Sequence, residues 1–119
     1  MTVLSVTEDS FDTIISFPGI VFLDCWAEWC PPCRAFKPVF EAAAKVHTDI
    51  TFGTIDTAKE VTLAGALEIT SIPTIMAFRD GILVFSRAGA LRAADLEGLI
   101  EAVRALDMDE VRAQARESE

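Results

Sequence analysis

The sequence predicts an α/β fold with a central mixed sheet of about five strands, flanked by about four helices. Two observations support this prediction. Apolar runs of strand length alternate with segments whose apolar residues recur every three or four positions, in the order β-α-β-α-β-α-β-β-α. The early alternation implies parallel strands, and an Asp-Gly pair between the last two apolar runs predicts a hairpin that adds an antiparallel edge. The 119 residues suit one domain with a substantial core.

The predicted strands differ in how their apolar residues are arranged. The run Ile20–Trp26 is almost continuously apolar, as expected of a central strand that is covered on both faces. Shorter strands are predicted at Val3–Val6 and at Thr51–Asp56. The hairpin joins Thr74–Arg79 to Ile82–Arg87 through the Asp-Gly turn.

The predicted helices are marked by apolar faces and by a capping residue. Thr7 can cap the first helix, and the acids that follow it suit the positive end of the helix dipole. We expect residues 1–106 to form the domain, and the polar residues 107–119 to form a helix extension or a tail. The helices are predicted from Thr7 to Ser16, from Pro31 to about His47, from Val61 to Leu67, and along the apolar face from Leu96 to Leu106.

Charge and hydropathy exclude several classes of protein. The chain has 10 Lys and Arg against 19 Asp and Glu, which gives a net charge of -9. This balance argues against binding to nucleic acid or to anionic membranes, where Lys and Arg make the contacts. The sequence shows no basic leader and no apolar run long enough to span a bilayer. We therefore expect a cytoplasmic monomer, in a compartment where thiols are kept reduced.

The segment Trp29-Cys30-Pro31-Pro32-Cys33 is the strongest chemical signal in the sequence. It follows the predicted central strand and opens an amphipathic helix, whose first turn tolerates proline. The positive end of the helix dipole stabilises a thiolate there and lowers its pKa, and thiolate is the species that attacks disulfides. We expect Cys30 at the mouth to be the nucleophile, and Cys33, one turn inward, to resolve the mixed disulfide.

Two other interpretations of these cysteines are a zinc half-site and a pair of inert buried thiols. Zinc needs two more ligands, and only Cys25 and His47 remain, neither at the spacing of a ligand pair. We therefore predict no metal site.

Asp24 is the second signal, because it interrupts the apolar strand. Alternation places it on the same face as Phe22 and Trp26. Burial penalises the charged carboxylate, so the pKa of Asp24 should be raised. Such a group near a dithiol can accept the proton of Cys33 when that thiol attacks. The alternative is an Asp at the end of a strand that reaches solvent.

These residues resemble the active-site segment of the thioredoxin family. The resemblance covers the run from Leu23 to Cys33, the helical Pro38, the loop Ser71-Ile72-Pro73-Thr74, and the loop Ala88-Gly89-Ala90. It extends over nearly the whole chain, from about residue 3 to residue 106.

The resemblance implies a thioredoxin fold and a dithiol–disulfide exchange activity. It implies that the peptide bond before Pro73 is cis and that Pro73 faces the dithiol, so that Pro73 belongs to the catalytic site. It also implies that a substrate groove is lined by Trp29, Pro31, Ile72 and Gly89.

Three positions depart from the family's usual pattern. Pro31-Pro32 stands where typical thioredoxins have Gly-Pro, which should shift the redox potential in a direction that the sequence does not give. Phe52 stands where many thioredoxins place a buried lysine near the aspartate, so we expect a stronger upward shift in the pKa of Asp24. Cys25 occupies a commonly aromatic position, and we expect it to be a small buried hydrophobic residue.

The function predicted from the sequence is that of a general protein disulfide reductase. The resemblance implies that electrons come from NADPH through thioredoxin reductase, that disulfide-containing proteins are the substrates, and that no cofactor is bound. Two alternatives are a specialised oxidoreductase or isomerase with a shifted potential, and a binding module of thioredoxin fold without redox turnover.

Overall fold

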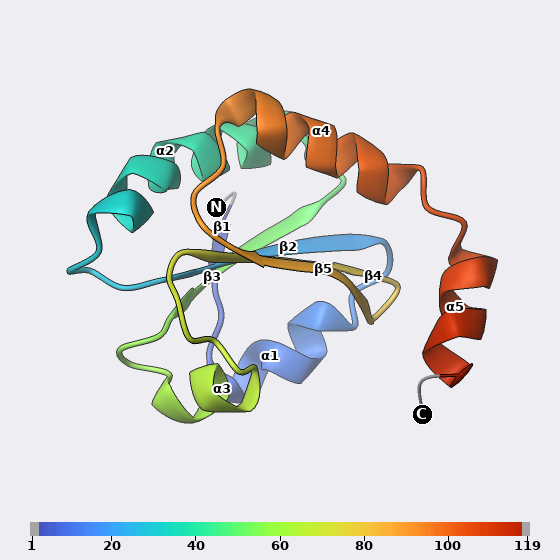
Figure 1. Ribbon diagram of the computed structural model, residues 1–119, viewed down its shortest axis with the longest axis horizontal. Helices are drawn as coiled ribbons and strands as arrows, with labels where there is room; N and C mark the ends of the chain where they lie inside the picture. Colours follow the sequence, from blue (N-terminus) through green and yellow to red (C-terminus); the bar gives the residue numbers. More distant parts are fainter. Residues whose placement is uncertain (1–2, 118–119) are drawn as a thin grey trace.

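The computed structural model describes residues 3–117, which form a five-stranded sheet with helices on both faces (Figure 1). The strands are β1 (Val3–Ser5), β2 (Ile20–Trp26), β3 (Thr51–Asp56), β4 (Thr74–Arg79) and β5 (Ile82–Ala88). The helices are α1 (Glu8–Ile15), α2 (Pro31–Val46), α3 (Val61–Ala66), α4 (Ala93–Arg104) and α5 (Met108–Glu117).

The strand order β1-β3-β2-β4-β5 places β2 at the centre of the sheet. β2 is parallel to β3 and antiparallel to β4, and β4 is antiparallel to β5. The predicted mixed α/β fold is therefore confirmed, with a fifth helix beyond the four expected. None of the helices in the described part of the chain is long and apolar enough to cross a membrane.

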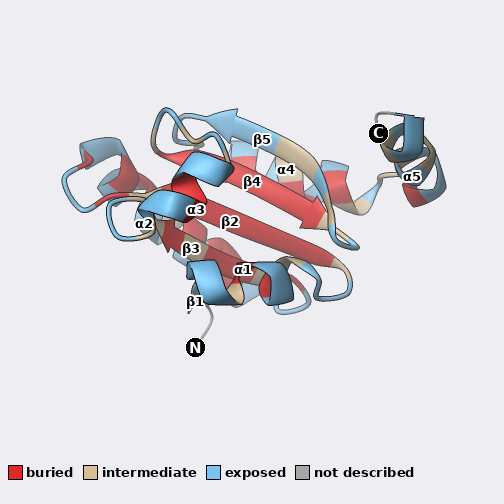
Figure 2. Cartoon of the chain, turned by 90° about the horizontal axis from the view of Figure 1, so that it is seen from below, coloured by how far each residue is buried: buried red, intermediate tan, exposed pale blue. Residues whose placement is uncertain are grey.

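The sheet divides the core into two layers. Helices α2 and α4 cover one face, and α1 and α3 cover the other (Figure 1). Figure 2 shows that β2 and β4 are buried along nearly their whole length, whereas much of β5 is exposed. In the layer under α2, the ring of Phe52 lies 5.9 Å from that of Phe22 and 5.2 Å from that of Phe40.

Two local predictions are confirmed by hydrogen bonds and backbone angles. Thr7 caps α1 in a capping box, in which its side chain accepts a hydrogen bond from the backbone N–H of Ser10. Asp80 and Gly81 have φ values of 52° and 81°, and two positive values in succession are typical of the tight turns that match the twist of a hairpin.

The polar C-terminal segment forms a separate helix, α5, which begins after a break from α4. The side chain of Asp107 accepts hydrogen bonds from the first backbone N–H groups of α5, and Met108 is buried. Arg112 forms an ion pair with Asp80 at 3.2 Å, and the other oxygen of Asp80 accepts the N–H of Gly19 at 3.1 Å. Asp80 therefore links α5 to the β4–β5 turn and to the start of β2.

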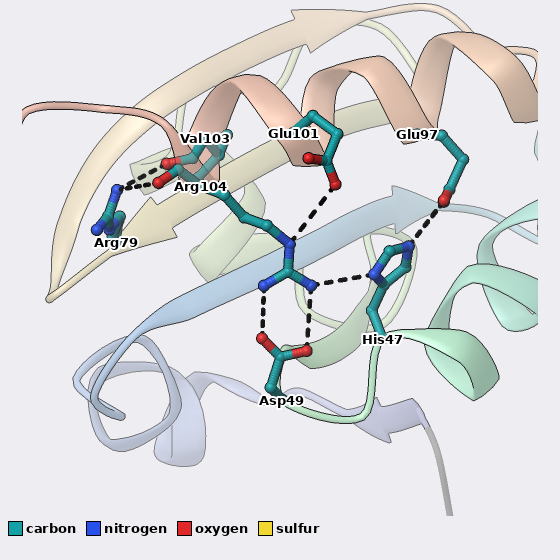
Figure 3. Close-up of polar contacts among 7 residues, drawn as sticks. All are labelled: His47, Asp49, Arg79, Glu97, Glu101, Val103 and Arg104. Carbon is teal, nitrogen blue, oxygen red and sulfur yellow. Dashed lines mark hydrogen bonds and ion pairs between the residues drawn. The ribbon is translucent and has the colours of Figure 1, made fainter.

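A charged cluster connects the end of α2 to α4 (Figure 3). The guanidinium of Arg104 binds both carboxylate oxygens of Asp49, and this hydrogen bonding lowers the pKa of Asp49 to about 2. Arg104 also donates to Nδ1 of His47 at 3.0 Å, so Nδ1 is the acceptor nitrogen of the ring. Nε2 then carries the hydrogen and donates it to Glu97 at 2.8 Å.

Arg79, at the end of β4, supports the C-terminal end of α4 (Figure 3). One of its guanidinium nitrogens donates to the carbonyl oxygens of Val103, Arg104 and Leu106 at 2.9–3.1 Å. Carbonyls at the end of a helix lack partners within the helix, and the dipole there favours a cation. Arg79 thus fixes α4 against the sheet.

Replacing Arg79 by methionine should lower the free energy of unfolding by about 2 kcal/mol, because charge-assisted hydrogen bonds to the end of α4 are lost. Urea unfolding at pH 7 measures the change. Arg87→Met is the matched control, since Arg87 is exposed on the adjacent strand β5 and should change stability by less than about 0.5 kcal/mol. Equal effects of the two variants would contradict the role given to Arg79.

Candidate active site

The dithiol lies where the central strand β2 leads into helix α2. The connecting loop closes with a hydrogen bond from the N–H of Cys30 to the carbonyl of Ala27 at 3.2 Å. Cys30 is the N-cap of α2, and Pro31 and Pro32 fill the first turn, where missing N–H groups are tolerated. The N–H of Cys33 donates to Sγ of Cys30 at 3.3 Å. The helix terminus therefore directs one N–H group and its positive dipole end at the first sulfur.

Cys30 and Cys33 are joined as a disulfide, with their Cα atoms 5.2 Å apart. Their exposed fractions are 3% and 2%, so both residues are buried in this disulfide form. Their neighbours do differ. Sγ of Cys30 lies 3.8 Å from the carbonyl oxygen of Ile72, whereas Cys33 lines a cavity that it shares with Asp24.

Two further loops, one before β4 and one after β5, belong to the surroundings of the disulfide. The Ile72–Pro73 peptide bond is cis, as the family resemblance implied, and Pro73 is buried. The N–H of Gly89 donates to the carbonyl of Pro73 at 2.8 Å, which joins the two loops. Gly89 has a φ of 110°, a conformation that favours glycine. Trp29, next to Cys30, is 71% exposed and is the kind of side chain that recognises partners.

Asp24 is buried in the middle of β2, with 3% of its surface exposed. Its Oδ1 atom has no hydrogen-bond partner. Burial raises the pKa of Asp24 from 3.8 to about 7, because the charged form loses its hydration. The buried position and the direction of the shift confirm the prediction made from the sequence, and they exclude an Asp that reaches solvent at the end of a strand.

The cavity beside Asp24 has a volume of about 490 Å³. Cys33, Trp26 and Phe40 line it, and so do four charged side chains: Glu28, Arg34, Lys37 and Glu41. Sequence reasoning did not single out these charged residues. Cys33, Lys37 and Glu41 follow one another at the four-residue spacing of a helix face, and this pattern could have identified them from the sequence as neighbours.

The two remaining departures from the family pattern are both buried. Phe52 packs its ring among other aromatic rings, so β3 places no cation at this position. Cys25 is a free thiol in the opposite core layer, as alternation predicts. Burial, with the charge of Asp24 adding to it, raises the pKa of Cys25 to about 12. Within residues 3–117, no group of three or more His, Cys, Asp or Glu side chains is arranged to hold a metal ion.

The thioredoxin family model matches residues 2–102. The chain belongs to the thioredoxin family. It is similar to "Putative thioredoxin 2" of Streptomyces coelicolor, with 43% identity over 116 residues that cover 98% of this chain and 87% of that protein.

Two solved structures show the same architecture. A mutant thioredoxin from Halobacterium salinarum has a TM-score of 0.80 and 32% identity, and the match covers 87% of this chain and 92% of that one. A thioredoxin from Plasmodium falciparum has a TM-score of 0.77 and 34% identity, and the match covers 83% of this chain and 97% of that one. Thioredoxins are disulfide oxidoreductases, and the close Cys30–Cys33 pair fits the active site of this thioredoxin-family chain. Its activity is thiol–disulfide exchange.

The stability of this thioredoxin-family protein should depend on the charge of Asp24. Because the folded chain binds the Asp24 proton more tightly than the unfolded chain, this residue lowers stability as the pH rises from about 4 to about 7. Above pH 7, the ionised carboxylate costs up to about 4 kcal/mol.

Asp24→Asn should therefore unfold at higher urea concentration than the native chain at pH 8, and at nearly the same concentration at pH 4. The difference between the two proteins isolates Asp24 from the other carboxylates. An equal difference at both pH values would contradict the assignment.

Proposed function

We propose that this protein reduces disulfide bonds in other proteins, with Cys30 as the attacking thiolate and Cys33 as the resolving thiol. The observation that supports this assignment is the hydrogen bond from the Cys33 N–H to Sγ of Cys30 at the start of α2. An N–H donor and the positive end of a helix dipole stabilise negative charge on that sulfur. Sγ of Cys33 receives no such hydrogen bond among the described residues and borders the cavity of Asp24 instead.

The first step is attack of the Cys30 thiolate on one sulfur of the substrate disulfide. The substrate S–S bond breaks, a Cys30–substrate disulfide forms, and the other substrate sulfur leaves as a thiolate that takes a proton from water. The substrate segment lies against Ile72, Pro73 and Gly89, where the backbone of Ile72 can pair with an extended chain, as an added strand does. Trp29 and Pro31, which are both exposed, extend this proposed contact surface for the substrate.

The second step releases the substrate. Asp24, as a carboxylate, accepts the proton of the Cys33 thiol, and the resulting sulfur attacks Sγ of Cys30. The mixed disulfide breaks, the second substrate sulfur leaves as a thiolate, and the Cys30–Cys33 disulfide forms. A carboxyl group with a pKa of about 7 is suited to this exchange, since it is ionised in a large fraction of molecules near neutral pH and is still basic.

The oxidised pair then takes two electrons from an external reductant. For this family the reductant is thioredoxin reductase, which passes electrons from NADPH. The exchange at Cys30 and Cys33 needs no cofactor bound to this chain. We place the reaction in the cytoplasm, where target disulfides are reduced rather than made, and we assign the active form as a monomer.

Cys33→Ser should stop the reaction after the first step and accumulate a covalent adduct between Cys30 and the substrate. Incubation of the reduced variant with insulin whose disulfide bonds are intact, followed by non-reducing electrophoresis and mass spectrometry, detects that adduct. Cys30→Ser is the matched control and should form none.

The native chain should precipitate the insulin B chain when thioredoxin reductase and NADPH are supplied. The proposed function would be overturned if the Cys33→Ser protein formed no adduct and the native protein left insulin intact under the same conditions.

A further inference from the structure

The cavity beside Asp24 contains the one buried side-chain oxygen without a hydrogen-bond partner among residues 3–117. An ionised carboxylate in such a place needs a nearby cation or hydrogen-bond donors, because without them the free-energy cost of removing it from water is not offset. The neighbouring strands supply no cation, although the hydroxyl-bearing Thr54 also lines the cavity. Asp24 pairs with Thr54 on β3 and with Ile75 on β4, and the strand position two residues before Thr54 holds the apolar ring of Phe52.

The charged groups around Asp24 come from α2 and from the loop before it. Arg34 is already engaged, since its guanidinium donates to the carbonyl of Glu28 at 3.3 Å. Glu28 and Glu41 are acidic and oppose ionisation of Asp24. Lys37 borders the cavity, and among residues 3–117 its ammonium group has no hydrogen bond or ion pair. Of the two cations that line the cavity, Lys37 is thus the one that has no hydrogen bond or ion pair of its own among residues 3–117.

The position of Lys37 on α2 relates it directly to the resolving thiol. Lys37 lies four residues after Cys33, so the two side chains are neighbours on the surface of the helix, one turn apart. A lysine stem is long and flexible, and it can lie along the apolar wall of the cavity formed by Phe40 while its ammonium stays hydrated.

We propose that Lys37 stabilises the ionised form of Asp24 across this cavity and is thereby a positioning residue for proton transfer from Cys33. Removal of its charge leaves fewer molecules with an Asp24 carboxylate at neutral pH, and Cys33 then loses its proton acceptor. This inference rests on the proposed role of Asp24 in substrate release.

The first test is the titration of the Asp24 carboxyl carbon by NMR in the oxidised protein, where neither Cys30 nor Cys33 titrates. Lys37→Met keeps the length of the stem and removes the charge. It should move the Asp24 midpoint upward, corresponding to about a threefold smaller acid dissociation constant. Lys37→Arg should restore the native midpoint, and Lys45→Met, with the same charge change in the last turn of α2, should leave it unmoved.

The second test is the pH profile for release of a mixed disulfide, prepared by coupling a disulfide peptide to Cys30. Lys37→Met should slow release about threefold below neutral pH and little above pH 8.5, where Asp24 is ionised in both proteins. The proposal is overturned by an Asp24 midpoint that Lys37→Met does not move, or that Lys45→Met moves equally. If Asp24→Asn releases substrate at the native rate, then the role of Asp24 itself is wrong, whatever the midpoint in Lys37→Met shows.

Discussion

The N-terminus of helix α2 is fixed at the end of the central strand β2, and the placement of every reactive group depends on this junction. β2 is hydrogen-bonded to β3 on one side and to β4 on the other, and both of its faces are covered by helices. A strand held in this way cannot shift without breaking both core layers. It therefore presents Cys30 at a helix start, where the N–H of Cys33 and the dipole meet its sulfur, and it keeps Asp24 in the interior.

Those features that depend on local chemistry could be predicted from the sequence. The almost continuously apolar run Ile20–Trp26 has the bounds of β2, because a strand covered on both faces leaves few polar positions. Thr7 and the Asp80-Gly81 pair fixed a helix start and a turn through their own backbone preferences. The burial of Asp24 followed from its apolar neighbours, and the cis bond at Pro73 was implied by the family motif.

The features that depend on distant contacts could not be predicted in this way. The separate helix α5 is held by Met108 and by the pair of Arg112 with Asp80, which is 32 positions away in the sequence. The nearly equal burial of Cys30 and Cys33 in the disulfide form was likewise not predicted, and Sγ of Cys30 lies 3.8 Å from the carbonyl oxygen of Ile72 in a distant loop. Side-chain burial in a loop-lined site is a property of the assembled fold and has no local pattern.

The measurement that tests the central claim most directly is the alkylation of the reduced protein by iodoacetamide as a function of pH, with the modified cysteine identified by mass spectrometry. If the start of α2 stabilises a thiolate on Cys30, that residue is modified first, with a midpoint clearly below the ordinary thiol value of about 8.5. Cys33 and the buried Cys25 remain unmodified over the same time. First modification at Cys33, or a midpoint for Cys30 at or above the ordinary value, would contradict the account.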